Sequence, residues 1–350
     1  MNTVKKIEIV SLSRGLLGEP FVRHEKELGL RRLKDRGIEV VFAKHALDGI
    51  DALSAHPEDR AADLLCALED ETVDMILCAI GGDDTYRLLP YLFDHGELAL
   101  AVKKSPSRKI FLGFSDTTTN HLMLHKVGLP TFYGQSFLSD LCELAPEMLP
   151  YTQSYFDQLI RTGGIAEVRP SGVWYEERTC FDESALGTDR VSHPDGGFEV
   201  LQGAPVFEGE ILGGCIDTLY DLFDNTRYAD SVSLTSAYHL FPTKKDWEGK
   251  ILLLESSEEK MPPAKYKDAL LKLKETGLFD VLHGVLIGKP IDRVYEEDYK
   301  AILKEVLPPS LPVVCNLNIG HASPRCILPF GVKAVVDAKE QVIRFPAFVE

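Results

Sequence analysis

Ser115 is the residue whose type and setting most clearly indicate chemistry. A short apolar run ends in Gly113-Phe114-Ser115-Asp116, and threonines at 117–119 then open a segment with helical spacing. A serine between a strand end and a helix start lies at the carboxyl edge of an open α/β sheet, where such sheets bind ligands. The helix N-terminus offers N–H groups to a developing anion there. Ser115 is therefore a candidate nucleophile of a serine hydrolase, and a plain helix N-cap is the alternative.

The residue two positions after this serine limits the fold that can carry it. An α/β-hydrolase elbow needs glycine at that position, and this chain has Thr117. If Ser115 is a nucleophile, the fold is not the ordinary α/β-hydrolase.

A serine nucleophile needs a general base and an acceptor that orients the base. Among ten histidines, His321 stands out because it lies in Gly320-His321-Ala322-Ser323-Pro324, past an expected strand end and among small neighbours. Glu255 closes the apolar run 251–254 and so emerges at a strand's carboxyl end, as Ser115 does. An exposed loop histidine and an ordinary strand-end charge are the alternatives.

A second glycine-rich turn, Ala79-Ile80-Gly81-Gly82-Asp83-Asp84, also follows an expected strand. Two such turns converge at one edge of a sheet, so N–H groups around Gly82 are expected to form an oxyanion hole with the N–H of Asp116. We interpret Asp84 as a helix cap and not as a metal ligand. The Gly-Gly pair lacks the spacing of a dinucleotide-binding turn, so no such cofactor is expected.

Two further patterns have ordinary explanations beside functional ones. His121 and His125 share a helix face at zinc-binding spacing, but Leu122 stands where a zincin has glutamate and no third ligand is evident. We therefore expect helix packing and no metal. Trp174-Tyr175 is expected either to fill a core or to form a stacking platform for a planar ligand.

The elements that position these residues indicate two domains. The chain has 350 residues, and single cores usually stop growing near about 250 to 300. Strand-like and helix-like patterns alternate through residues 1–135, which predicts an α/β fold with a parallel sheet covered on both faces. The expected strands are 7–12, 39–43, 74–79, 109–114 and 130–133, and the expected helices are 21–36, 57–69, 85–93 and 117–126. Residues 1–140 are thus expected to form a doubly wound, flavodoxin-like nucleophile domain.

The regular alternation of strand-like and helix-like patterns ends after about residue 140. Residues 141–192 are expected to be a linker and interdomain arm, because prolines and Gly163-Gly164 interrupt the pattern. Residues 193–350 are expected to form a mixed α/β domain of swivelling type that carries Glu255 and His321. Its expected strands are 198–201, 206–212, 250–255, 281–287, 313–315, 333–337 and 341–345, and its expected helices are 263–276 and 297–306.

Composition argues against several classes of partner. The net charge is −16, from 38 basic and 54 acidic residues, and no block of five basic residues occurs, so nucleic acid and anionic membranes are not expected. No apolar run reaches roughly 18 residues, so no membrane span is expected, and the first residues predict a strand and not a signal peptide. Seven scattered cysteines, none in a Cys-x-x-Cys pair, are typical of reduced thiols in a cytoplasm.

Five motifs in this chain resemble those of the LD-carboxypeptidases, serine peptidases with a Ser-Glu-His triad. They lie, in order, at 79–84, 113–116, 208–214, 252–255 and 320–324. The resemblance covers nearly the whole chain and implies that Ser115 is the nucleophile, His321 the general base and Glu255 its orienting carboxylate. It also implies a cytoplasmic homodimer with its active site between the domains and without a metal or other cofactor.

Within the family, the chain is more similar to the microcin C immunity peptidases than to the muropeptide-recycling branch. The recycling enzymes tend to carry arginine before the glycine pair, where this chain has Ile80. Residues 169–174 also resemble a segment of the immunity branch whose tryptophan stacks on a nucleobase. The resemblance places four residues in the substrate site: Gly81, Asp83, Trp174 and Cys215.

The chain departs from the family pattern where the substrate is expected to bind. Cys215 follows the Gly213-Gly214 pair, where the family usually has asparagine, and a common Gly-Thr appears as Asn225-Thr226. Tyr175-Glu176 also differs from the usual residues after the tryptophan. These changes leave the triad intact and the specificity open.

We therefore expect a serine carboxypeptidase-type hydrolase that cleaves an amide bond in a small, peptide-like substrate. An immunity-type peptidase that hydrolyses aminoacyl-nucleotide or acyl-sulfamoyl amides is the alternative among enzymes. A catalytically silent small-molecule binding protein is the alternative outside them.

Overall fold

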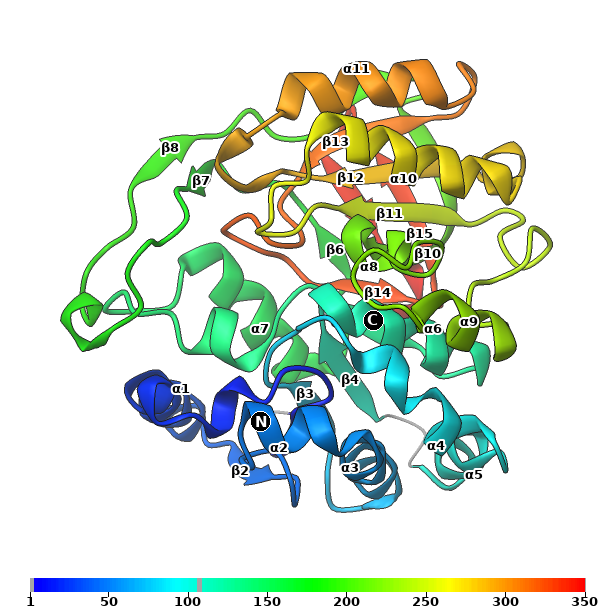
Figure 1. Ribbon diagram of the computed structural model, residues 1–350. Coiled ribbons are helices and arrows are strands. Elements are labelled where there is room, and N and C mark those ends of the chain that lie inside the picture. The colour runs from blue at the N-terminus through cyan, green and yellow to red at the C-terminus, as the bar shows by residue number, and fades with distance from the viewer. Residues whose placement is uncertain (1–2, 106–108, 350) are drawn as a thin grey trace. The chain divides into compact units, whose positions relative to one another are not determined.

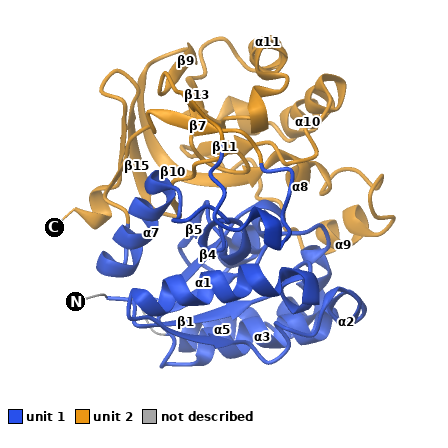
Figure 2. Ribbon diagram, turned by 90° about the vertical axis from the view of Figure 1, so that its left-hand side faces the viewer, with its two compact units in different colours: residues 1–164, 178–190 blue, residues 165–177, 191–350 orange. Residues whose placement is uncertain are grey.

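The computed structural model of the protein describes residues 3–105 and 109–349, and the chain divides into two compact units (Figure 2). Unit 1 comprises Met1–Gly164 and Arg178–Arg190, and unit 2 comprises Ile165–Glu177 and Val191–Glu350. Each unit has a sheet of its own that contains parallel strands, so the predicted α/β class is confirmed.

The sheet of unit 1 has the strand order of a flavodoxin-like fold. Its strands are β1 (Lys6–Val10), β2 (Glu39–Phe42), β3 (Met75–Cys78), β4 (Ile110–Gly113) and β5 (Thr131–Tyr133). They lie in the order β2-β1-β3-β4-β5, and each neighbouring pair is parallel. Every residue of β3 and β4 is buried, as expected when helices cover both faces of a parallel sheet. In this topology ligands bind at the carboxyl edge of the strands.

Helices fill the connections between these strands, and α7 follows the last of them (Figure 1). They are α1 (Arg23–Asp35), α2 (Ile50–Ala55), α3 (Pro57–Glu69), α4 (Leu89–Phe93), α5 (Glu97–Lys104), α6 (Thr118–Lys126) and α7 (Pro150–Thr162). The helices α3 and α6 agree with the expected ranges to within one residue. The expected helix over 85–93 is a 3-10 turn, Thr85–Leu88, that continues into α4.

The segment 141–192 is more ordered than the linker and arm expected from its prolines and glycines. The helix α7 joins unit 1, where the N–H of Val4 donates to the carbonyl of Ile160 at 2.9 Å. Residues 178–190 return to unit 1, because Arg178 and Arg190 both pair with the buried carboxylate of Glu143, at 2.8 and 2.7 Å. Residues 165–177 and 191–192 of this segment belong to unit 2.

Unit 2 is built on a mixed sheet. Its strands are β6 (Glu167–Val168), β7 (Val173–Tyr175), β8 (Ser192–Pro194), β9 (Glu199–Gln202), β10 (Val206–Cys215), β11 (Ile251–Glu255), β12 (Gly284–Gly288), β13 (Val313–Leu317), β14 (Leu328–Phe330), β15 (Lys333–Asp337) and β16 (Val342–Arg344). Eight of them form a sheet in the order β6-β16-β15-β10-β11-β12-β13-β9. The central run β10-β11-β12-β13 is parallel, and antiparallel strands extend it on both sides. The strands β7 and β8 pair separately, and β14 belongs to neither of these two sheets.

Four helices accompany this sheet: α8 (Ile216–Tyr220), α9 (Ser231–Ala237), α10 (Pro263–Glu275) and α11 (Glu296–Val306). The helices α10 and α11 connect successive parallel strands and pack together through the stacked rings of Tyr266 and Tyr299, whose centroids are 4.0 Å apart. Across residues 3–105 and 109–349, no helix is both long enough and apolar enough to cross a membrane.

Candidate active site

Ser115 lies where the sequence places it, between the end of β4 and the start of α6. Its φ is 67°, in the left-handed region that non-glycine residues rarely adopt. The Ser115 N–H donates to the Tyr133 hydroxyl at 3.2 Å, so β5 helps to hold the serine in this conformation. Backbone outliers of this kind concentrate at functional sites.

The structure also bears on the alternative that this serine is a helix cap. A 3-10 turn, Ser115–Thr117, precedes α6. The N-cap positions of the turn and of the helix are Phe114 and Thr117. Ser115 therefore occupies neither capping position, which favours a chemical reason for its presence.

The glycine-rich turn after β3 approaches Ser115 closely. A Cβ atom added to Gly81 would lie 2.6 Å from the Cβ and 2.7 Å from the Oγ of Ser115. Gly82 has a φ of 156°, and a Cβ atom there would overlap the hydroxyl of Ser13. The parallel sheet thus brings two strand-end turns together in unit 1. The N–H groups of Gly82 and Asp116 remain the predicted oxyanion donors.

The side chain of Asp116 ties the loops of unit 1 to one another. Its buried carboxylate accepts hydrogen bonds from the Ser13 hydroxyl at 2.6 Å and from the Thr85 N–H at 2.9 Å. Burial raises the pKa of Asp116 to about 6, although both hydrogen bonds lower it. Two loops of unit 1 therefore fix the side chain of the residue after the candidate nucleophile.

The two aspartates that follow Gly82 differ in their surroundings. Asp84 stands at the N-cap position of the turn Thr85–Leu88, but its side chain makes no capping hydrogen bond. Its carboxylate instead accepts hydrogen bonds from the buried guanidinium of Arg60, at 2.6 and 3.2 Å. The capping interpretation of Asp84 is therefore wrong, because a buried ion pair engages its oxygens. Asp83 is exposed and stays a predicted substrate-binding residue.

His121 is a packed residue of unit 1. Its Nδ1 lies 2.7 Å from the Thr131 hydroxyl, and its Nε2 lies 3.1 Å from the Gly113 carbonyl. Burial lowers the pKa of His121 to about 4, although the hydrogen bond to Gly113 raises it. A buried, hydrogen-bonded imidazole agrees with the interpretation that this helix face packs against the sheet.

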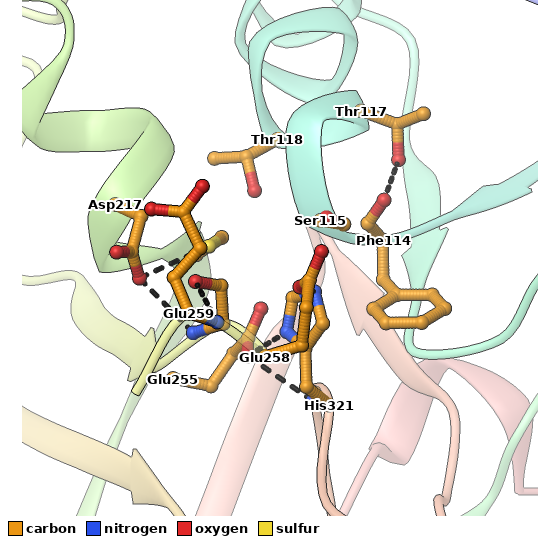
Figure 3. A network of polar contacts seen from close by, with 12 residues as sticks. Phe114, Ser115, Thr117, Thr118, Asp217, Glu255, Glu258, Glu259 and His321 are labelled. Atoms are coloured by element: carbon orange, nitrogen blue, oxygen red, sulfur yellow. Dashed lines mark hydrogen bonds and ion pairs between the residues drawn. The ribbon is translucent and has the colours of Figure 1, made fainter. Parts of the chain in front are cut away.

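In unit 2, Glu255 and His321 form a buried pair (Figure 3). Glu255 is the last residue of β11, and its side chain has no exposed surface. One carboxylate oxygen lies 2.7 Å from Nδ1 of His321 and also accepts the backbone N–H of His321 at 3.2 Å. This acceptor favours a proton on Nδ1, which leaves Nε2 as the basic nitrogen of the ring. Gly320 is required beside the pair, because a Cβ atom there would overlap the carboxylate.

Two other charged residues surround His321. Arg325 donates to the carbonyls of Gly320 and His321 at 2.5 and 2.8 Å and so fixes the loop. A carboxylate oxygen of Glu258 lies 3.2 Å from Nε2. Burial lowers the pKa of His321, but the charge and hydrogen bond of Glu255 and the charge of Glu258 raise it more, so the pKa is above its ordinary value.

The thiol of Cys215 lies beside this pair. Cys215 ends β10 and is the register partner of Glu255 at the end of β11. Its Sγ, a carboxylate oxygen of Glu255 and a ring nitrogen of His321 all lie within 4.8 Å of one another. Sγ also contacts a carboxylate oxygen of Asp217 at 3.8 Å. Burial and the charges of Glu255 and Asp217 raise the pKa of Cys215 well above its ordinary value.

Three residues of this cluster were not predicted from the sequence: Asp217, Arg325 and Glu258. Asp217 follows a strand end by two residues, a position that could have been examined as those of Ser115 and Glu255 were. Arg325 acts on backbone carbonyls of an irregular loop and leaves no periodic signal. The side chain of Glu258 is 69% exposed, yet it reaches His321.

Trp174 lies on β7 and is half-buried. It is the register partner of His193 on β8, and their stacked rings have centroids 4.4 Å apart and an interplanar angle of 20°. The guanidinium of Arg293 lies 5.9 Å from the centroid of the indole. The indole thus lies on a two-stranded ribbon with polar neighbours and is not buried in a hydrophobic core.

The predicted residues therefore form two groups, one in each unit. Ser115, the glycine-rich turn 81–83 and Asp116 belong to unit 1, whereas Glu255, His321, Cys215 and Trp174 belong to unit 2.

Both units match domains of one peptidase family. Residues 7–134 match the LD-carboxypeptidase N-terminal domain, and residues 208–336 match the LD-carboxypeptidase C-terminal domain. The chain belongs to the LD-carboxypeptidase family, as its motifs predict.

Relatives extend this assignment over most of the chain. A solved MccF-like protein from Streptococcus pneumoniae, in complex with AMP, is 59% identical, with a TM-score of 0.96, over 98% of this chain and 99% of that one. The Microcin C7 self-immunity protein MccF of Escherichia coli is 25% identical over 88% of this chain and 84% of its own length. A Bacillus subtilis protein named "Probable murein peptide carboxypeptidase" is 26% identical over 88% of this chain and 83% of its own length.

Proposed function

We propose that this protein is a serine-type amide hydrolase in which Ser115 is the nucleophile, His321 the general base and Glu255 the group that orients the base. The observation that carries the proposal is the buried pair of His321 and Glu255, with 2.7 Å between Nδ1 and the carboxylate. The left-handed backbone at Ser115, in a chain of the LD-carboxypeptidase family, supports the nucleophile.

The reaction follows from these groups. Ser115 Oγ attacks the carbonyl carbon of the amide while Nε2 of His321 takes the hydroxyl proton. The oxyanion of the tetrahedral intermediate accepts hydrogen bonds from the N–H groups of Gly82 and Asp116. His321 then gives its proton to the leaving amine, and the C–N bond breaks to leave an acyl-serine. Water, deprotonated by His321, hydrolyses the ester and restores Ser115.

Glu255 contributes by holding this base in one tautomer. A carboxylate on Nδ1–H keeps Nε2 free of a proton and stabilises the imidazolium formed during attack. Its complete burial strengthens the interaction, because little water competes for the charge. The raised pKa of His321 is the expected consequence.

We further propose that the substrate carries a nucleotide joined to an aminoacyl group through an amide-type bond. Support comes from the 59% identical protein, which was solved with AMP, and from the half-buried indole of Trp174, which offers a surface for a planar base. A small muropeptide is the second candidate, because a relative is named as a murein peptide carboxypeptidase. From the family resemblance we also propose a cytoplasmic homodimer, which light scattering after gel filtration would test.

The substrate proposal is tested by incubating the protein with an aminoacyl-sulfamoyl adenosine and, separately, with a tetrapeptide muropeptide, and separating the products by chromatography. Release of the amino acid from the nucleoside compound alone supports it. Cleavage of the muropeptide alone contradicts it and selects the second candidate. Binding of either compound without cleavage contradicts the enzyme proposal and indicates a silent binding protein. Activity should survive exhaustive chelation, because each proposed step uses only side chains and water.

A further inference from the structure

We propose that Cys215, Glu255 and His321 form a binding site for a thiophilic divalent cation, best matched by Zn²⁺, and that the bound ion switches the enzyme off. A thiol, a carboxylate and an imidazole are the three kinds of ligand that zinc takes from proteins. Here the three ligand atoms lie within 4.8 Å of one another, and all three residues are buried.

Strand register and hydrogen bonds bring these three ligands together. Cys215 and Glu255 end two neighbouring parallel strands in register, and His321 is held against Glu255 by both its ring and its backbone N–H. Zinc sites need ligand atoms roughly 3.3–3.8 Å apart, given metal–ligand bonds of about 2.0–2.3 Å. Side-chain adjustments of roughly 1 Å would therefore close the three atoms around an ion.

The electrostatics of the cluster also favour a cation. The buried thiol lies beside the carboxylates of Glu255 and Asp217, two groups that carry negative charge when ionised. Asp217 is itself buried, and among the residues that the structure describes its Oδ1 atom has no hydrogen-bond partner. A buried, unpartnered carboxylate oxygen costs free energy, and an ion bound at the neighbouring thiolate would offset this cost.

Binding exchanges protons for the ion. The thiol of Cys215 loses its proton to solvent, and the proton on Nδ1 of His321 is replaced by one on Nε2, so the ring stays neutral. Zn–S, Zn–N and Zn–O bonds then form to Cys215, His321 and Glu255. Water or Asp217 supplies the fourth ligand of a tetrahedral site. A neutral imidazole that binds zinc through Nδ1 carries its proton on Nε2. The ring can then no longer accept a proton from a serine hydroxyl.

The loss of activity rests on the proposed function, but the binding does not. The binding test therefore uses the whole protein without substrate. Chelator-treated protein is titrated with Co²⁺, a spectroscopic substitute for Zn²⁺, and thiolate-to-cobalt charge transfer is followed in the near ultraviolet. We expect the band to saturate at about one ion per chain and to disappear when Zn²⁺ displaces Co²⁺.

Variants assign the band to this cluster. Cys215→Ser should abolish it and weaken Zn²⁺ binding by about tenfold or more. Cys315→Ser is the matched control, because it removes another buried thiol of unit 2 that lies outside the cluster, and it should bind Co²⁺ as the wild type does. His321→Ala should weaken Zn²⁺ binding by a similar factor. Because His321 lies on a loop, this variant provides a second test of the site if Cys215→Ser does not fold.

If the wild type shows no band, or if Cys215→Ser shows an unchanged band, the proposed metal site is wrong. If the protein hydrolyses a substrate, Zn²⁺ should inhibit the reaction and a chelator should restore it fully. Saturated binding without inhibition would contradict the proposal that the ion inhibits the enzyme, but not the proposal that it binds. A protein that binds Zn²⁺ through Cys215 but hydrolyses nothing would contradict only the proposed function.

Discussion

Nδ1 and the backbone N–H of His321 both point to the same oxygen of Glu255, at 2.7 and 3.2 Å. One carboxylate oxygen thus fixes the ring and the main chain of the histidine together. The arrangement depends on Gly320, since any side chain there would displace the carboxylate. Arg325 secures the same loop from its carbonyl side.

Glu258 should tune the pH dependence of the reaction. Its charge raises the pKa of His321, and general-base catalysis requires the unprotonated ring, so kcat/KM should rise with pH through the pKa of His321. Glu258→Gln removes a negative charge that favours the imidazolium, so the rise should move to lower pH. Glu259→Gln is the control, because that carboxylate pairs with Arg227. A profile for Glu258→Gln that superimposes on the wild type would contradict this role.

Gly81 should be intolerant of any side chain. In Gly81→Ala, the new methyl would lie 2.6 Å from Ser115 Cβ, so the serine must shift, with a loss of about 1–3 kcal/mol in the free energy of unfolding and a large loss of kcat. Gly196→Ala places its methyl in open space and should change stability by less than about 0.5 kcal/mol. Denaturant melts and kinetics on both variants check this, and normal turnover in Gly81→Ala would contradict the geometry.

The adjacent aspartates, Asp83 and Asp84, should contribute very differently to the stability of the fold. Asp84→Ala leaves the guanidinium of Arg60 buried without its carboxylate and should cost about 3–5 kcal/mol in the free energy of unfolding. Asp83→Ala, at an exposed position, should change it by less than about 0.5 kcal/mol. Urea unfolding measures both variants. Equal stabilities would show that the ion pair of Asp84 contributes little.

Trp174 should distinguish the two substrate classes. Stacking of an indole on a base contributes about 1–3 kcal/mol, so Trp174→Ala should raise KM for an aminoacyl-nucleotide by roughly tenfold or more. Trp174→Phe retains an aromatic face and should lose less. A muropeptide has no aromatic ring to stack, so its KM should change little. A stable Trp174→Ala variant with an unchanged KM for aminoacyl-nucleotides would contradict the stacking proposal.

The sequence predicts the regular parts of the fold well because periodicity and strand ends are local signals. The apolar runs gave β3, β4 and β11 to within one residue, and the positions just after them contain Ser115 and the glycine-rich turn. The same rule located Glu255. Candidate residues at the carboxyl edge of a parallel sheet can thus be located before the fold is known.

Other parts depend on contacts that leave no local pattern. The helix α7 was missed because Pro150 was taken to interrupt structure, although proline is favoured at the first position of a helix and a glycine such as Gly163 at its end. The ion pair of Asp84 with Arg60 joins residues 24 positions apart, so the sequence favoured a local cap instead. The contact of Glu258 with His321 joins residues that are far apart in the chain. Arg325 bonds carbonyls of its own loop, but that loop has no regular pattern.

The most direct test of the account is the turnover of Ser115→Ala on whichever substrate the wild type cleaves. Removing the nucleophile should lower kcat by at least about three orders of magnitude, with the melting temperature nearly unchanged. Ser11→Ala is the matched control, because it removes another hydroxyl of unit 1, bonded to the Ala46 carbonyl, and it should retain turnover. A folded Ser115→Ala protein with near-normal kcat would contradict the serine mechanism.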